Sequence, residues 1–470
     1  MELKERSMIR RCTALAAAIL LVAAGMLIPL PEGLSRQGLC ALCLMGANIV
    51  CWIGDVAPKS VVGLASVVLL PLLGIADNVN DVFKNFSNSI LFFLLAAAAL
   101  SVAVKNSSIP QRIMRFFLRV FGRSTRLIIL AFMTTTAVVS AVMTDLAACV
   151  LCAAVAIPLF QDDERFSQNP NFVKCMFIGI PAAALAGGTA TPIGSASNIT
   201  MMGLLGESIG LEVSWARWMA VGIPLSLISL FATWFVMTAI LRPKRLSQEE
   251  LASFQHTLGN LKPLNVFDIK TIAILVALLL LWTFSDVIHV NTTIVALAGM
   301  VIIFMPGMDL VTWKEFKEEA PWDMLIMLGS LFALAAYLLS TKAVDWISNV
   351  VLAQVGGLSP FFFLLVICTM IALMRGATPA GAPIVSMLTP IFVTMAAGMG
   401  IDPFCIVILM SVWAQITFLL PPCDALYLVT YSLRRYSILD VLKFGVPLTV
   451  GLLVLYSAIV PPMVALTAAL

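Results

Sequence analysis

Long apolar runs separated by short polar connections make up most of this chain. A transmembrane helix needs about 20 consecutive apolar residues. Runs close to that length lie at 12–30, 37–54, 60–76, 88–105, 172–206, 214–241, 268–287, 291–306, 323–341, 403–431 and 444–468. The first run follows a basic segment but lacks a small-residue cleavage site, which favours a span over a signal peptide. The pattern predicts about eleven transmembrane helices.

Two further runs, 126–160 and 359–398, are too long for one span, and polar, Gly or Pro residues interrupt each of them halfway. We interpret both as re-entrant helical hairpins, which enter and leave the membrane on one side. The distribution of basic residues supports this topology when the N-terminus is cytoplasmic. The Lys and Arg residues then fall on the inner side, apart from Arg36, Lys84, Arg217, Lys342 and Arg375.

The loop 106–122 contains the sequence IPQRIMRFFLRVFG. Its Arg112, Arg115 and Arg119 share one helical face, opposite aromatic and aliphatic side chains. This spacing predicts an amphipathic helix that lies on the membrane surface.

Two of the predicted spans are broken at their centres, by GGTATPIGSASNIT (187–200) and by FLLPPCDALYLVTYS (418–432). Each follows a hairpin, and the polar linker 243–267 separates the two halves. The number of intervening spans turns the second half over, which predicts an inverted repeat. Inverted repeats with interrupted helices are typical of secondary transporters with a binding site at mid-membrane. The predicted parts are a scaffold at 1–125, a transport part at 126–206, a second scaffold at 207–358, a second transport part at 359–431 and a last helix at 432–470.

Composition agrees with an all-α polytopic membrane protein. Of 470 residues, 61% are hydrophobic and 11% are charged, and the mean hydropathy is +1.03. Soluble domains have about 25% charged residues. The only histidines, His256 and His289, stand apart in polar loops, so we expect neither a zinc site nor a cofactor, and no nucleic-acid partner.

The first hairpin combines residue types that suit a cation. Ser140 and Thr144 are spaced i, i+4, which predicts both hydroxyl groups on one helical face. Asp145 adds a full charge, and Gly194 in the following break offers an unpaired backbone carbonyl. The alternative is that the hydroxyl groups bond back to carbonyls one turn earlier, as is common in membrane helices.

The breaks also contain polar residues that suit an anion. Ser195, Asn198 and Thr378 are neutral hydrogen-bond donors, and helix N-termini after each break add partial positive charge. Asn198 can instead bond to its own loop. Asp424, the second acid within a break, is either a site residue or the N-cap of the following half-helix.

Arg375 precedes Gly376 at the tip of the second hairpin. Its guanidinium group is expected to replace a cation, to pair with Asp145 or Asp424, or to bind a substrate carboxylate through two hydrogen bonds. The alternative is that the side chain extends to the outer membrane surface.

At these residues the chain resembles the divalent anion/sodium symporter family. The two breaks resemble the family's Gly-Thr-Pro-Pro-Asn and Leu-Pro-x-Ala-Thr-Pro segments, and the layout matches over nearly the whole length. Family hairpin tips contain Ser-Asn-Thr. Here Asp145 replaces the Asn and Leu146 follows it, whereas the second tip lacks the motif.

The resemblance implies an elevator-type symporter that moves a di- or tricarboxylate, or sulfate, with sodium as the coupling ion. It implies a homodimer in the cell inner membrane. It also places Leu146 among the substrate contacts and a second cation site at Gly376, Ala377 and Cys423.

Two other functions remain open from the residues alone. A proton- or sodium-coupled cation antiporter would use Asp145 as the titrating group. An intramembrane aspartyl protease would pair Asp145 with Asp424, but Pro-Pro-Cys-Asp stands where such enzymes have Gly-x-Gly-Asp. We therefore expect a transporter and not an enzyme.

Overall fold

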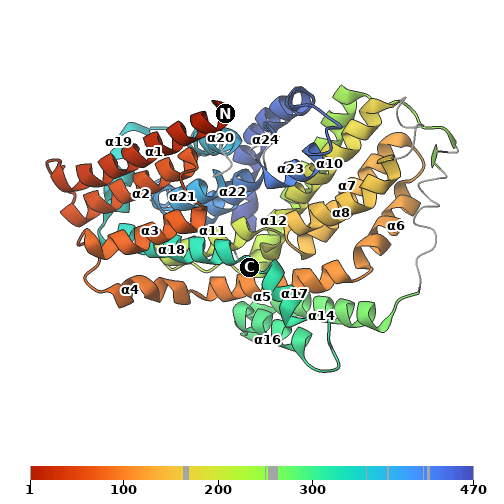
Figure 1. Ribbon diagram of the computed structural model, residues 1–470, viewed down its shortest axis with the longest axis horizontal. Coiled ribbons are helices and arrows are strands. Elements are labelled where there is room, and N and C mark those ends of the chain that lie inside the picture. The colour runs from red at the N-terminus through yellow and green to blue at the C-terminus, as the bar shows by residue number, and fades with distance from the viewer. Residues whose placement is uncertain are drawn as a thin grey trace. The chain divides into compact units, whose positions relative to one another are not determined.

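The computed structural model describes the chain except for residues 1, 162–168, 249, 252–262, 356, 378–380, 417, 421–423 and 469–470. Its described residues form helices and no strands (Figure 1). Backbone contacts divide the chain into two compact units. The first contains Met1–Phe92, Thr200–Val213 and Pro321–Met410, and the second contains Phe93–Ile199, Ser214–Ala320 and Ser411–Leu470.

The first unit contains the N-terminal helices and the second hairpin. Its helices are α1 (Glu2–Leu27), α2 (Arg36–Gly54), α3 (Lys59–Leu72), α4 (Val79–Lys84), η1 (Asn85–Ser87), α18 (Trp322–Ser340), α19 (Ala343–Val355), α20 (Pro360–Ala377), α21 (Gly381–Gly398), most of α11 (Ala196–Ile209) and the start of α22 (Pro403–Gln415). Helix α1 packs along α2, α3 packs against α18, and α21 contacts both α19 and α20. The close approach of α3 to α18 requires Gly63, because a Cβ atom there would lie 2.9 Å from Cβ of Ser330.

The second unit is built around α10 (Pro170–Gly188). Every residue of α10 from Cys175 to Gly188 is buried, as expected for a helix that is apolar on all sides. Helices α7, α8, α12 and α23 pack around it. The other helices of this unit are α5 (Ser89–Asn106), α6 (Ile109–Phe121), α7 (Thr125–Val142), α8 (Asp145–Gln161), η2 (Pro192–Gly194), α12 (Trp215–Leu241), α14 (Val266–Thr283), α15 (Ser285–Ile288), α16 (Thr292–Phe304), α17 (Trp313–Glu319), α23 (Ala425–Tyr431) and α24 (Ile438–Leu466).

Nine helices in the described part of the chain are long and apolar enough to cross a bilayer. Each coincides with a predicted span or with the first arm of the first hairpin, which confirms a polytopic helical membrane protein. The remaining predicted spans correspond to the shorter apolar helices α3, α16 and α22. The count of eleven spans therefore stays a prediction.

The sequence pattern missed three helices, of which the six-residue α4 is the shortest. Helix α17 is short and polar, and it begins with a capping box between Thr312 and Glu315. Helix α19 has 13 residues, too few for a span, and it follows α18 after two residues. A search for runs of membrane-crossing length does not detect helices as short as these.

The amphipathic helix predicted after Asn106 is present as α6. Its Met114 and Leu118 are buried against the protein, whereas Phe116 is 60% exposed. Its position on a membrane surface stays a prediction. Arg112, one of the three arginines expected on the polar face, instead lies beside a buried carboxylate of α14.

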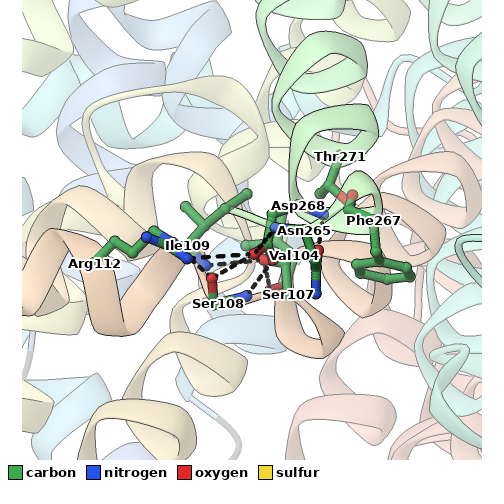
Figure 2. Close-up of polar contacts among 9 residues, drawn as sticks. All are labelled: Val104, Ser107, Ser108, Ile109, Arg112, Asn265, Phe267, Asp268 and Thr271. Atoms are coloured by element: carbon green, nitrogen blue, oxygen red, sulfur yellow. Dashed lines mark hydrogen bonds and ion pairs between the residues drawn. The ribbon is translucent and has the colours of Figure 1, made fainter. Parts of the chain in front are cut away.

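That carboxylate, Asp268, joins α6 to the first turn of α14 (Figure 2). It accepts hydrogen bonds from the backbone amide of Ser108 (2.8 Å) and from the Ser108 hydroxyl (2.7 Å). It also forms the capping box of α14 with Asn265. Arg112 lies 3.7 Å from the carboxylate and donates to the Ser108 hydroxyl oxygen at 2.7 Å. The Asp268 side chain is 2% exposed, so these contacts compensate for its burial.

We expect Asp268→Asn to lower the melting temperature of the purified protein markedly. An amide nitrogen cannot accept the bonds from Ser108 and Asn265, and a buried donor without a partner costs about 1–3 kcal/mol. Asp345→Asn is the matched control, because Asp345 is an exposed acid in the first turn of α19. Equal melting temperatures for the two variants would show that the Asp268 contacts do not stabilise the fold.

Candidate functional site

The tip of the first hairpin lies between α7 and α8. Helix α7 ends at Val142, and Met143 has an extended backbone (φ −144°, ψ 176°). Thr144 donates its backbone amide to the Ser101 hydroxyl at 3.3 Å, and Asp145 is the first residue of α8. A helical hairpin is therefore present, and its re-entrant course in the membrane stays a prediction. Because α7 ends before Thr144, however, the i, i+4 spacing does not place Ser140 and Thr144 on one helical face.

Close backbone packing fixes this hairpin against α10. A Cβ atom at Gly187 would lie 2.2 Å from the carbonyl oxygen of Ala137, so only glycine permits this approach of α10 to α7. The Ser140 hydroxyl donates to the carbonyl of Ala184 at 2.7 Å, not to the carbonyl one turn earlier. The neighbouring Thr135 and Thr136 do form such backward bonds within α7. The Ser140 hydroxyl thus holds the hairpin on the broken helix.

The helical break predicted at 187–200 is present. Helix α10 ends at Gly188, the 3-10 turn η2 follows, and α11 begins at Ala196. The Thr191 hydroxyl donates to the carbonyl of Ala141 at 2.6 Å, which joins the break to the end of α7. Gly194 is required at the end of η2, because a Cβ atom there would lie 2.5 Å from the Gly188 carbonyl oxygen.

Asn198 closes the break by pairing its free carbonyl groups. Its side-chain amide donates to the carbonyl oxygens of Gly188 and Thr191, both at 2.7 Å. Its side-chain oxygen accepts from the Ser411 hydroxyl and from the Gln415 side-chain amide, both at 2.5 Å. The predicted alternative for Asn198, a bond to its own loop, is thus present.

Three groups gather at the position where Gly188 has no side chain. A Cβ atom at Gly188 would lie 3.0 Å from Oε1 of Gln415, 3.1 Å from the carbonyl oxygen of Gly194 and 3.4 Å from Cβ of Asp145. The hairpin tip, the break and the end of α22 therefore meet here. Carboxylate, carbonyl and carboxamide oxygens are the ligands that hard cations prefer.

Two predicted site residues flank this cluster. Ser195 is buried, and its hydroxyl accepts from the amide of Ser197 at 3.4 Å in the first turn of α11. Leu146 is 42% exposed and donates its backbone amide to the Asp145 carboxylate at 2.8 Å.

Asp424 is a helix N-cap, which is one of the two roles predicted for it. Its carboxylate accepts from the backbone amide of Leu426 at 2.7 Å, and it is the N-cap of α23. Helix α23 packs against α8, where the Cys149 thiol donates to the carbonyl of Leu426. The two acids thus begin neighbouring helices of one unit.

The second hairpin belongs to the first unit. Arg375, Gly376 and Ala377 form the last turn of α20. Arg375 is only 8% exposed, and it lies within electrostatic range of Lys59 at the start of α3. Thr378 at the tip and Cys423 in the second break lie outside the described residues.

Ser411 and Gln415 were absent from the predicted site. They occupy one face of α22 at the end of a long apolar run. A polar pair spaced i, i+4 directly before the FLLPP break was the only local signal in the sequence. Their partner Asn198 is distant in the chain, so only the fold shows what they contact.

Residues 9–462 match the family model described as the sodium:sulfate symporter transmembrane region. The chain belongs to this family. A sodium-dependent dicarboxylate transporter, SdcS of Staphylococcus saprophyticus, is 24% identical over 92% of this chain and 88% of its own length. The sodium-dependent high-affinity dicarboxylate transporter 3 of Caenorhabditis elegans is also 24% identical, over 88% of this chain and 81% of its own length. The predicted family resemblance is therefore confirmed.

Solved structures support the fold of this family member. The YdaH transporter of Alcanivorax borkumensis is 15% identical with a TM-score of 0.58, covering 88% of this chain and 99% of its own. MtrF of Neisseria gonorrhoeae is 14% identical with a TM-score of 0.56, covering 97% and 94%. Both likenesses concern the fold alone.

We expect Gly194→Ala to disrupt the break and to lower the melting temperature, because its new Cβ atom would meet the backbone of Gly188 and not a flexible side chain. Gly206→Ala is the control. No atom lies within 4 Å of a Cβ at Gly206 in α11, and alanine favours a helix over glycine by about 1 kcal/mol. If Gly194→Ala melts at or above the temperature of Gly206→Ala, the close packing of the break is wrong.

Proposed function

We propose that this protein is a secondary transporter of the inner membrane that couples sodium entry to the uptake of a small divalent anion. Family membership and the named relatives support sodium-coupled anion transport. We propose a dicarboxylate as the anion, because the two relatives described above are sodium-dependent dicarboxylate transporters. Sulfate, which the family description names, is the second candidate.

The position of Asp145 carries this proposal. Its carboxylate begins α8 at the hairpin tip, and its Cβ atom lies against the broken helix at Gly188. A carboxylate at membrane depth is costly unless an opposite charge or water compensates it. A sodium ion held by Asp145 and by carbonyl oxygens of the break supplies that charge. The proposed ligands belong to both the hairpin tip and the break. Movement of this region would therefore change their spacing and release the cation.

Two features favour an anion as the other substrate. The N-terminus of α11 lies at the break, beside the buried Ser195, and the helix dipole gives it a partial positive charge. In the other unit, Arg375 is only 8% exposed, and a guanidinium group can bind a carboxylate through two hydrogen bonds. We propose that Arg375 binds a substrate carboxylate.

We propose an elevator mechanism in which the first hairpin and its broken helix move as one body. The glycine contact between α7 and α10 and the bonds from Ser140 and Thr191 leave little freedom between them. Packed interfaces of this kind shift as rigid elements. The homodimer expected for the family stays part of this proposal.

We expect a sodium gradient to drive uptake of labelled succinate into proteoliposomes, with no uptake when choline replaces sodium. Asp145→Asn should weaken the sodium dependence, because it removes the negative charge that balances the cation. The matched control is Asp345→Asn, which should behave as the unchanged protein. Proton efflux on sodium addition without uptake of succinate or sulfate would instead favour a cation antiporter.

Arg375→Gln should raise the KM for succinate about ten-fold or more, the effect of losing roughly 1.4 kcal/mol of a charged, bidentate contact. Lys342→Gln removes an exposed cation of the same unit and should leave KM unchanged. Uptake kinetics at saturating sodium provide the measurement. Normal KM and normal sodium stoichiometry in Arg375→Gln would exclude a substrate role.

A further inference from the structure

Gln415, at the end of α22, presents a buried oxygen atom to the cluster around Gly188. The side chain is only 3% exposed. Within the described part of the chain, its Oε1 accepts no hydrogen bond. A buried acceptor without a partner costs about 1–3 kcal/mol, so such an atom requires an explanation.

The hydrogen-bond network determines which atom of the Gln415 amide faces the cluster. The Asn198 amide nitrogen has two carbonyl partners, Gly188 and Thr191, so only that nitrogen can occupy this position. The Asn198 oxygen must then face Gln415, which requires the Gln415 nitrogen as donor. The same nitrogen donates to the carbonyl of Ser411 at 3.1 Å. A flipped Gln415 amide would place two oxygens in contact, so Oε1 is held toward Gly188.

The surroundings of this oxygen are suited to a cation. Oε1 and the Gly194 carbonyl oxygen both lie about 3 Å from the position of a Cβ at Gly188, and the Asp145 side chain borders the same position. All three side-chain or backbone groups supply oxygen acceptors. One full negative charge, from Asp145, balances one monovalent cation, and neutral dipoles complete its coordination.

We propose that the carboxamide oxygen of Gln415 is a ligand of the coupling sodium ion, together with Asp145 and the Gly194 carbonyl. This inference rests on the proposed sodium-coupled function. It extends that function because it adds a ligand from α22, a helix outside the first hairpin and the first break. An ion bound here connects the first hairpin, the first break and α22. Departure of the ion removes one of the contacts that hold α22 to the tip of the first hairpin.

The test measures sodium affinity from the rise in melting temperature with sodium concentration, without anion and at constant ionic strength with choline. A ligand that binds only the native state raises its stability by mass action. Gln415→Met removes the oxygen at similar volume, and Gln415→Asn retains both amide groups but withdraws the oxygen by one methylene. We expect both variants to raise the sodium dissociation constant about ten-fold or more.

Ser411→Ala is the matched control, because it removes the other donor to the same Asn198 oxygen and leaves Oε1 of Gln415 in place. If Gln415 acts only through Asn198, Ser411→Ala will weaken sodium binding as much as the Gln415 variants do. Unchanged sodium affinity in Gln415→Asn and Gln415→Met would show that water fills this acceptor. Either result overturns the inference. Failure of sodium to stabilise the unchanged protein at all would instead contradict the proposed function.

Discussion

A helix that is broken inside a bilayer must find new partners for the carbonyl and amide groups that it frees, because lipid offers none. In this protein Asn198 provides them at the first break. Its amide pairs the carbonyls of Gly188 and Thr191, and its oxygen accepts from Ser411 and Gln415. One side chain therefore permits the irregular backbone and connects it to α22. The groups proposed to bind the cation converge at Gly188, whose carbonyl belongs to this closed break.

Glycine residues, which have no side chain, position the hairpin as much as hydrogen bonds do. Gly187 allows α10 to touch the backbone of α7, and Gly188 leaves space where Asp145, Gly194 and Gln415 converge. Small residues serve this purpose in membrane proteins, where close packing replaces the hydrophobic effect as the force between helices. The same glycines that break the helix thus also create the site.

The sequence allowed the hairpins, the broken span and the family to be predicted, because each leaves a local signature. A run too long for one crossing, with Asp145 at its centre, indicates a hairpin, and GGTATPIGSASNIT cannot continue a helix. The shared face of Ser140 and Thr144 was wrong because the helical period was extended past Val142, where the extended Met143 ends it. Gln415 was missed because its role depends on Asn198, a contact across more than two hundred residues that no local pattern encodes.

The central claim is that the tip of the first hairpin and the first break enclose the coupling cation. An experimental structure determined in sodium with a bound dicarboxylate tests it most directly. The account predicts ion density in contact with the carboxylate of Asp145 and the carbonyl of Gly194, and loss of that density when choline replaces sodium. Sodium density elsewhere, with the Asp145 carboxylate directed away from Gly188, would contradict it.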